Sequence, residues 1–545
     1  MRHYLSRLQD ATVNYWDKPA LNTIDGESFT YGQVATIMKK LGIFFKKIGV
    51  TGDDKIAVCA KNSARWGISF LAVATNGMVN VPILNDFTPE SICKLIDHSE
   101  SVGLFTTADK WAKLDVAKMP LLKFVIDMDS WELLWAKDEG IREARASVES
   151  EFAKEFPNGF GPGDVHYEAD NLDKLAAINY TSGTTSDPKG VMLTYRNFSA
   201  NIDFSQRNVP SSSKYSMVSM LPMAHMYGLV IEFIYPLCNG TAIYWLGKAP
   251  TPTTLFAAFE KVHPYLLITV PLVMEKIFKL RIIPQLSKQP VKFLLHIPGI
   301  SNLILGKVRK SIQAAFGGQV QQFIMGGAAL NPEVEHWLRR IGLNYTVGYG
   351  MTEACPLLAY EHYSKYVPGS CGKAMDFATV RIDSEDPEHV VGEIQAKGDN
   401  ICIGYYKNPE ASANLFTEDG FMRTGDLGII DKNGNIFIKG RCKTMILGPS
   451  GQNIYPEELE NVINNLPYVA ESLVVDRGGK LVGLVYLDET KTKGMSHEDR
   501  DGIADSIRVS ANNVFPVYSK LVKVELRDAP FEKTPKMSIK RFLYK

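Results

Sequence analysis

Apolar, β-branched segments alternate with amphipathic helical segments through the first hundred residues, and this alternation limits the possible folds more than any other feature. Helical periodicity marks 31–49 and 88–100, and the second helix has Thr88 in the N-cap position. Strands are predicted at 55–60, 79–84 and 101–107. Buried strands joined through helices are typical of parallel sheets. The sequence therefore predicts an α/β fold.

The pattern changes after about residue 369. Short alternating strands are predicted at 392–398 and 427–441, and the turn sequence KNGN divides the second stretch into a hairpin. A helix follows at 456–466, with Pro456 in its first turn. Two further strands come after it. The end of the chain therefore predicts a small α+β domain.

The composition restricts the class of partner. The 545 residues are too many for one core, so several domains are expected. Lys plus Arg and Asp plus Glu both number 60, so no overall field favours nucleic acid. The seven cysteines lack a CxxC pair, which indicates reduced thiols rather than disulfides or a zinc site. Without a signal-peptide pattern or a predicted membrane span, a cytoplasmic location is expected.

One loop carries the first sign of chemistry. Residues 181–190, TSGTTSDPKG, lie between two apolar strands and combine backbone N–H groups with hydroxyl donors. Such a concave loop binds phosphate, and Lys189 adds a positive charge. Because the order Pro-Lys-Gly differs from the Walker pattern, a phosphate loop of another type is predicted. A flexible, solvated linker is the alternative.

Five further motifs follow in order, namely LPMAHMYG (221–228), MGGAAL (325–330), VGYGMTEACP (347–356), RTGDLGIIDKNGNIFIKGR (423–441) and PSGQNIYPEELE (449–460). With the loop they resemble the adenylate-forming superfamily of acyl-CoA synthetases, luciferases and peptide-synthetase adenylation domains. Within it, the chain looks most like the long-chain fatty acid–CoA ligases. The resemblance implies a large N-terminal domain of parallel-rich αβα sheets with a small β-barrel-like subdomain (1–440), a hinge (441–444) and a small, mobile α+β C-terminal domain (445–545).

The resemblance also implies a two-step reaction. A fatty acid carboxylate attacks the α-phosphate of ATP, which releases pyrophosphate, and CoA thiolate then displaces AMP from the acyl-adenylate. The implied small molecules are ATP, Mg²⁺, CoA and a fatty acid. An aryl or short-chain acid ligase and an acyl-AMP ligase are alternatives, as is a non-catalytic protein that binds nucleotide or acyl-AMP.

Phosphate and metal roles carry over to two motifs. Glu353 is expected to bind Mg²⁺, a hard cation that prefers oxygen ligands, and Thr352 to donate to the α-phosphate. Thr184 is a second expected metal contact. The residues expected to hold the β- and γ-phosphates are Thr181, Ser182, Gly183, Thr184, Thr185 and Lys189. A solvated loop acid is the alternative for Glu353.

Nucleoside and acyl roles carry over to the remaining motifs. Asp426 is expected to accept from both ribose hydroxyls, because a carboxylate is an acceptor only. Arg441 would contact ribose or phosphate, Lys443 matches the hinge, and His225 matches a position at the mouth of the acyl pocket. The adenine contacts are expected from Gly327, Ala328, Tyr349 and Gly350. Each of four residues has a structural alternative. Tyr349 could be a core aromatic residue and Asp426 part of a plain turn, while Lys443 could be an exposed linker lysine and His225 a structural histidine.

The C-terminus departs from the family pattern. In FEKTPKMSIKRFLYK (531–545), Ser538 stands where similar proteins have a lysine that bridges the carboxylate and the α-phosphate. Serine cannot supply this cation, and losing such a contact commonly costs about 10²- to 10³-fold in rate. Three interpretations stay open: a variant impaired in adenylation, substitution by Lys536, which has the same strand parity, or a non-catalytic binder. Lys540 is a weaker substitute.

Residues 276–310 combine aliphatic runs with eight Lys and Arg and no acid. Such a segment can rest peripherally on an anionic bilayer, where fatty acids dissolve. The alternative is a helix pair that covers the acyl tunnel with its lysines merely solvated. The chain is expected to be a monomer or a homodimer.

Overall fold

The largest sheet has seven strands and is the one that the alternating pattern predicts. The computed structural model describes residues 1–181, 188–248, 251–447, 452–533 and 539–544. The sheet order is β7-β6-β5-β3-β4-β8-β9, parallel except for the antiparallel outer pairs β6–β7 and β8–β9. Its strands are β3 (Lys55–Val58), β4 (Val79–Pro82), β5 (Ser101–Thr106), β6 (Phe124–Asp127), β7 (Leu133–Ala136), β8 (Leu175–Thr181) and β9 (Lys189–Thr194).

A second sheet, of order β10-β11-β1-β2, packs against the first through helix α3 (Ala64–Thr75). Every residue of α3 except Arg65 is buried, because the helix is apolar on all sides. The ring of Phe70 meets Phe233, which in turn meets Trp245 of the second sheet. The strands are β1 (Pro19–Thr23), β2 (Ser28–Thr30), β10 (Ser216–Ser219) and β11 (Ala242–Trp245).

Helices cover these sheets. α2 (Tyr31–Lys47) begins with a capping box between Thr30 and Gln33, and α4 (Pro89–His98) begins with the predicted cap, Thr88. The other α-helices of this region are α1 (Tyr4–Asn14), α5 (Ala108–Trp111), α6 (Glu139–Ala146), α7 (Val148–Glu155), α8 (Tyr195–Asn208), α9 (Tyr235–Leu237) and, later in the chain, α16 (Pro409–Leu415). A π-helix, Tyr227–Ile234, precedes α9.

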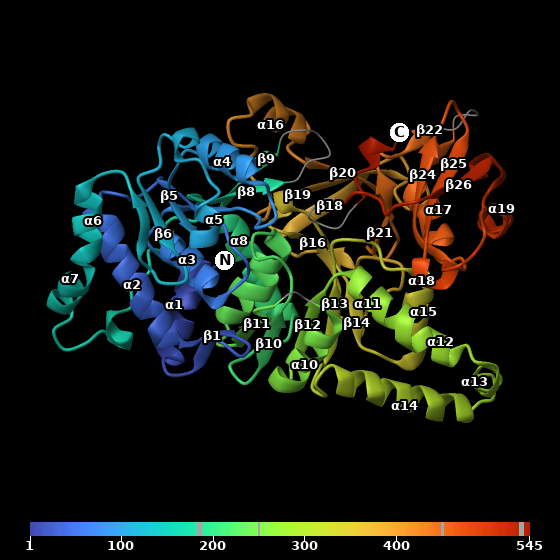
Figure 1. Ribbon diagram of the computed structural model, residues 1–545, viewed down its shortest axis with the longest axis horizontal. Coiled ribbons are helices and arrows are strands. Elements are labelled where there is room, and N and C mark those ends of the chain that lie inside the picture. Colours follow the sequence, from blue (N-terminus) through green and yellow to red (C-terminus); the bar gives the residue numbers. More distant parts are fainter. Residues whose placement is uncertain (182–187, 249–250, 448–451, 534–538, 545) are drawn as a thin grey trace.

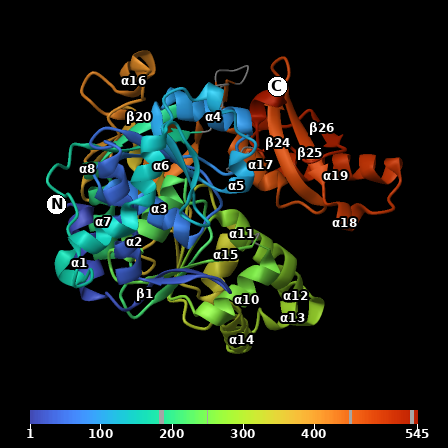
Figure 2. The same ribbon diagram turned by 60° about the vertical axis from the view of Figure 1, so that its left-hand side comes forward.

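A third, all-parallel sheet consists of β12 (Leu266–Thr269), β13 (Gln322–Met325) and β14 (Tyr345–Val347). α10 (Pro252–Val262) and α15 (Pro332–Ile341) belong to its core. Between β12 and β13 the chain extends as an arm away from the body (Figures 1 and 2). The arm contains α11 (Pro271–Ile277), α12 (Ile283–Leu286), α13 (Gln289–Leu294) and α14 (Ile300–Ala315).

Antiparallel sheets occupy the stretch for which the sequence predicts hairpins and a barrel-like subdomain. One has the order β18-β19-β20-β21 and the other β15-β16-β17. Their strands are β15 (Tyr349–Gly350), β16 (Leu357–Tyr360), β17 (Lys373–Ala374), β18 (Ala378–Asp383), β19 (Gly392–Gly398), β20 (Met422–Ile430) and β21 (Ile436–Arg441). The predicted hairpin is the β20–β21 pair, in which Asp426 lies opposite Arg441.

The C-terminal part has a core of its own, which includes Ile463, Val485 and Ile507. It lies at one end of the molecule, next to β21 and above the arm (Figure 1). Its elements are β22 (Ile446–Leu447), β23 (Asn453–Ile454), α17 (Pro456–Ile463), β24 (Val469–Asp476), β25 (Leu481–Leu487), α18 (Glu489–Thr492), α19 (His497–Val514) and β26 (Lys523–Arg527). Its sheet, β24-β25-β26, is mixed.

Candidate active site

Two glycine-containing turns leave the third sheet at the same edge. β13 ends at Met325 and leads into Gly326 and Gly327, and β14 ends at Val347 and leads into Tyr349. Because the carboxyl ends of parallel strands meet at one edge, the two predicted adenine motifs are neighbours. Gly327 has a φ of +88°, which favours glycine, and both Gly327 and Ala328 are exposed.

Tyr349, Asp426 and Arg441 form one hydrogen-bonded group. The hydroxyl of Tyr349 donates to Asp426 Oδ2 at 2.7 Å, and Arg441 Nε lies 3.0 Å from Asp426 Oδ1. Burial raises the pKa of Asp426, and the charge of Arg441 and the Tyr349 hydroxyl oppose that rise. The side chain of Arg441 is 65% exposed, whereas that of Asp426 is 8% exposed. The group therefore joins a buried acceptor to a cation that faces solvent.

A second group joins Lys189 to Glu353 through Tyr405. The hydroxyl of Tyr405 donates to Glu353 Oε1 at 3.0 Å, and Lys189 Nζ lies 4.8 Å from the centroid of the Tyr405 ring. A bridge between Tyr405 and Val191 fixes this segment against β9. Glu353 is half-buried in the turn Thr352–Ala354, where Thr352 is buried.

Tyr405 is a candidate residue that the sequence reasoning missed. The sequence GYYKNPE at 404–410 contains two adjacent tyrosines, Tyr405 and Tyr406. The sequence alone does not indicate which strand either tyrosine contacts. Only the bridge to β9, more than two hundred residues earlier, places Tyr405 between the predicted phosphate cation and the predicted metal ligand.

Gly350 has a packing role of its own. A Cβ atom at this position would lie 2.1 Å from the carbonyl oxygen of Pro356. The neighbouring backbone therefore requires glycine here, whether or not adenine binds beside it.

Thr181 and Lys189 are paired across β8 and β9, so the predicted phosphate loop connects two antiparallel strands. Within that loop Ser182, Gly183, Thr184 and Thr185 lie outside the described residues, as do Lys536 and Ser538 near the C-terminus. Lys533 and Ile539, on either side of that second stretch, form a bridge. Arg541 then pairs with Glu460 and, at 3.5 Å, with Glu457 of α17.

His225 and Lys443 lie in separate surroundings. His225 is half-buried just before the π-helix, and its carbonyl accepts from the N–H of Leu229 at 2.8 Å. Lys443 is exposed two residues beyond Arg441, in a turn where the hydroxyl of Thr444 donates to Glu457 at 2.7 Å. The predicted hinge therefore lies directly beside the Asp426–Arg441 pair.

A buried acid holds the segment that carries His225. Glu232 Oε2 accepts from Ser219 Oγ and from the N–H groups of Met220 and Leu221, at 2.8 to 3.0 Å. Burial raises the pKa of Glu232 to about 8, although the three hydrogen bonds lower this pKa. Glu232 Oε2 thus fixes the end of β10.

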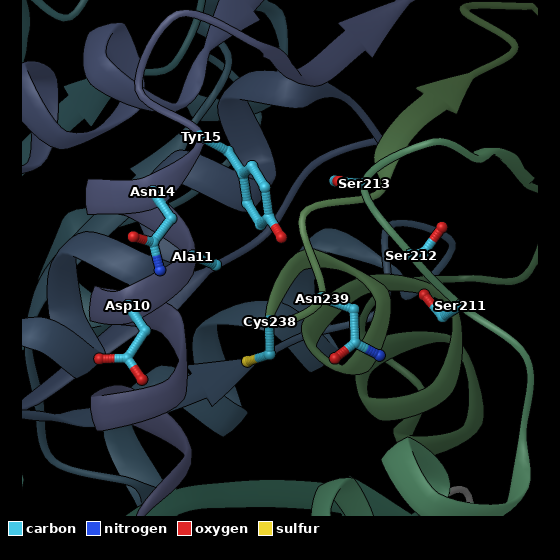
Figure 3. A pocket seen from close by; sticks show the side chains of 9 residues that line it. All are labelled: Asp10, Ala11, Asn14, Tyr15, Ser211, Ser212, Ser213, Cys238 and Asn239. Atoms are coloured by element: carbon cyan, nitrogen blue, oxygen red, sulfur yellow. The ribbon is translucent and has the colours of Figure 1, made fainter.

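A polar hollow of about 320 Å³ lies between α1 and the turns before β10 and after α9, and Figure 3 shows the side chains that line it. Its lining includes Asp10, Tyr15 and Asn239, and it shares no residue with either hydrogen-bonded group above. Among the described residues no three His, Cys, Asp or Glu side chains gather as a metal cage.

Comparison with known proteins defines the class. Residues 8–406 match the AMP-binding enzyme family, and residues 443–544 match the AMP-binding enzyme C-terminal domain. Together the matches span nearly the whole chain; Lys189, Glu353, Tyr405 and Tyr349 lie inside the first match, and Asp426 and Arg441 lie between the two matches. The chain therefore belongs to the AMP-binding enzyme family, the adenylate-forming class that includes the acid–CoA ligases.

Particular relatives refine this picture. Long-chain-fatty-acid–CoA ligase 4 of Saccharomyces cerevisiae is 28% identical over 513 residues, which cover 86% of this chain and 71% of that protein. ATP-bound MatB from Rhodopseudomonas palustris is 23% identical with a TM-score of 0.77, covering 100% of this chain and 98% of that one. Anthranilate CoA ligase AuaEII in complex with anthranoyl-AMP is 17% identical with a TM-score of 0.79, covering 99% and 96%. These structures confirm the predicted fold class.

Proposed function

We propose that the chain is an ATP-dependent fatty acid–CoA ligase. The joining of Lys189, Glu353 and Tyr405, next to the Tyr349–Asp426–Arg441 group, supports this proposal most. Residues far apart in sequence, namely Lys189, Tyr405, Asp426 and Arg441, contact each other and the short stretch of backbone 349–353, which supplies Tyr349 and Glu353. This combination suits a magnesium nucleotide better than it suits a purely structural role.

The donors of the second group fit a triphosphate and its metal. Mg²⁺ typically takes one or two protein carboxylates and completes its shell with phosphate oxygens and water. Glu353 would supply the carboxylate and Thr184 a second contact, while Lys189 and the loop 181–185 would hold the β- and γ-phosphates. Bound Mg²⁺ would neutralise charge on the leaving pyrophosphate.

The first group fits a nucleoside. A carboxylate offers about four lone-pair sites, and Tyr349 and Arg441 use one each on Asp426. Sites therefore remain for both ribose hydroxyls. The Tyr349 ring would stack on adenine, and the exposed backbone of Gly327 and Ala328 would let the base approach closely.

The reaction would use these residues twice. A carboxylate oxygen of the acid forms a bond to the α-phosphorus, next to Thr352, and the bond from that phosphorus to pyrophosphate breaks. CoA thiolate then attacks the acyl carbon and AMP leaves. We propose that 441–444, with Lys443, acts as the hinge about which the C-terminal domain (445–545) turns between the two steps.

The acid itself is the finer part of the proposal. The name of the yeast relative supports a long-chain fatty acid, with His225 at the mouth of the acyl pocket. The name of AuaEII supports an aryl acid as the alternative. ATP–pyrophosphate exchange measured with palmitate, octanoate and benzoate separates the two, because only the accepted acid drives exchange.

Ser538 is the position that decides whether adenylation is efficient. We expect Ser538→Lys to raise the exchange rate about 10²- to 10³-fold, because the new cation would stabilise the charge that develops between carboxylate and α-phosphate. The CoA step, started from synthetic acyl-AMP, should change little.

Two controls separate the interpretations. If Lys536→Ala abolishes a substantial native rate, Lys536 already supplies the cation. If neither the native protein nor Ser538→Lys shows exchange with any of the three acids, the chain is a non-catalytic binder of nucleotide or acyl-AMP and the ligase proposal is wrong.

A further inference from the structure

One face of the arm packs against the body. Leu295, Leu305 and Ile312 are each at most 6% exposed and belong to the core of the third sheet. Arg340 of α15 donates to the carbonyl of Leu295 at 2.8 Å. The inner face of α14 is therefore held against the third sheet.

The outer face of the arm shows large apolar side chains to solvent. Phe293 is 69% exposed, Leu303 70% and Ile300 38%. Phe293 lies in α13 at the far end of the arm, and the other two lie in the first turns of α14 (Figure 1). Exposed apolar clusters of this kind mark interaction surfaces.

Lysines surround this apolar tip. On α14, Lys307 and Lys310 follow Leu303 at i+4 and i+7, so the three share one side of the helix. Lys288 is the N-cap of α13, and Lys292 lies in its last turn. All four lysines are exposed, and none of them pairs with a carboxylate of the described residues.

The charge is local rather than general. The whole chain has a formal net charge of zero, yet 276–310 has eight Lys and Arg and no acid. The phosphates of a nucleic acid would bind the lysines but would offer no apolar contact to Phe293 and Leu303. An anionic bilayer satisfies both, because acyl chains take up the apolar side chains while headgroups meet the ammonium groups.

We propose that the tip of the arm, made of Phe293, Ile300 and Leu303 with Lys288, Lys292, Lys307 and Lys310, docks on the surface of an anionic membrane. None of the helices that the structure describes is both long and apolar enough to span a bilayer, so the contact is peripheral. The docking surface goes beyond ligase activity, and it would bring the site to the phase in which long-chain acids dissolve.

Sedimentation of the full-length protein with vesicles tests the proposal. We expect binding to phosphatidylcholine vesicles containing phosphatidylglycerol at low salt, weak binding to phosphatidylcholine alone, and release by 0.5 M NaCl because salt screens the lysines. Changing all four lysines to Gln should weaken binding several-hundredfold, at roughly fivefold per lysine. Phe293→Ser with Leu303→Ser should weaken it at least tenfold.

The C-terminal domain offers a matched control. Val517 and Val522 are 84% and 52% exposed, and Lys520 and Lys523 lie beside them in sequence. Changing the valines to Ser and the lysines to Gln removes two exposed apolar side chains and two positive charges, of which Lys523 lies 3.4 Å from Glu525, from another surface and should leave vesicle binding unchanged. An equal loss for each lysine removed in the arm and control variants would mean that binding follows total charge and would overturn the proposal.

Activity with octanoate, which is soluble, separates this proposal from the ligase proposal. Arm variants should keep full exchange activity with octanoate while losing vesicle binding. If the wild-type protein is active but does not bind anionic vesicles at low salt, the membrane proposal is wrong and the ligase proposal still stands. Concentration-dependent dimers that disappear in Phe293→Ser with Leu303→Ser would instead assign the tip to a second copy of the chain.

Discussion

Tyr405 links two functions that the sequence assigns separately. Its hydroxyl orients Glu353 and its ring lies near Lys189, so one side chain touches the predicted metal ligand and the predicted phosphate cation. The resemblance predicted Tyr349, Asp426 and Arg441 one motif at a time, and the structure brings these three into contact. Tyr405 could not be predicted in the same way, because its meaning depends on a long-range pairing with β9.

Tyr405→Phe should weaken the use of MgATP. The ring over Lys189 stays, but the hydrogen bond to the Glu353 carboxylate is lost, and such bonds contribute roughly 1.5–3 kcal/mol. We expect kcat/KM for ATP in the exchange assay to fall about 10- to 100-fold, with a higher Mg²⁺ concentration needed for half-maximal rate.

The neighbouring residue is a matched control for this substitution. The hydroxyl of Tyr406 also donates to a carboxylate, Glu100, at 2.5 Å, but away from Lys189 and Glu353. Tyr406→Phe should leave the Mg²⁺ dependence as it is. If both substitutions change the Mg²⁺ dependence of the exchange rate equally, the 403–408 segment affects the reaction only through the stability of the fold.

At the scale of elements, the buried Glu232, which accepts three hydrogen bonds at the end of β10, makes the stability of the fold depend on pH. Its pKa is raised to about 8 by burial, so the unfolded chain loses this proton at a lower pH than the folded one. The stability that the protonated group contributes is complete below the unfolded pKa and is lost as pH rises through about 8.

Glu232→Gln should therefore become more stable relative to the native protein as pH rises from about 5 to 8, by roughly 1.4 kcal/mol for each pH unit. The glutamine keeps the shape and the acceptor oxygen. Urea unfolding at pH 5, 6, 7 and 8 measures the difference. Glu410→Gln, at an exposed acid of α16, is the control for the substitution itself. Parallel pH profiles for Glu232→Gln and the native protein would contradict a protonated Glu232.

The elements that sequence patterns predicted are those with local signals. The helix predicted at 31–49 spans Tyr31–Lys47, because Gly49 adopts a φ of +65° just beyond its end. The helix predicted at 88–100 spans Pro89–His98 and ends before Glu100, whose φ is +58°. The π-helix at Tyr227–Ile234 and the division into separate sheets had no comparable signal, since both depend on tertiary contacts.

At the scale of the whole molecule, a small polar seam joins the C-terminal part to the arm and α15. Lys279 Nζ donates to the carbonyl of Asn464, the C-cap of α17, at 3.1 Å, and Asn331 Nδ2 donates to Asn465 Oδ1. A cation at a helix C-terminus is favourable. Burial lowers the pKa of Lys279, and the negative charges of Glu275 and Glu333 partly offset this decrease. The seam is thus specific but consists of few bonds.

Cys442 can report on this seam because it lies in the predicted hinge. It is exposed, whereas the other six cysteines are buried. Burial, together with the charges of Glu393 and Asp426, raises the pKa of its thiol. Movement of the C-terminal part away from β21 should relieve both effects and speed the reaction of Cys442 with a disulfide reagent.

Lys279→Met combined with Asn465→Ala should therefore increase the initial rate of Cys442 labelling at least threefold. Each lost hydrogen bond contributes about 1 kcal/mol, so the balance between docked and undocked arrangements shifts by roughly tenfold or more. Asn344→Ala, which removes a 2.8 Å bond to the Gln321 carbonyl away from the seam, is the control. Cys442→Ser, which removes the only exposed cysteine of the described residues, must abolish this rapid labelling. An unchanged rate in the seam variant would mean that contacts of α17 with β21, rather than the seam, hold the two parts together.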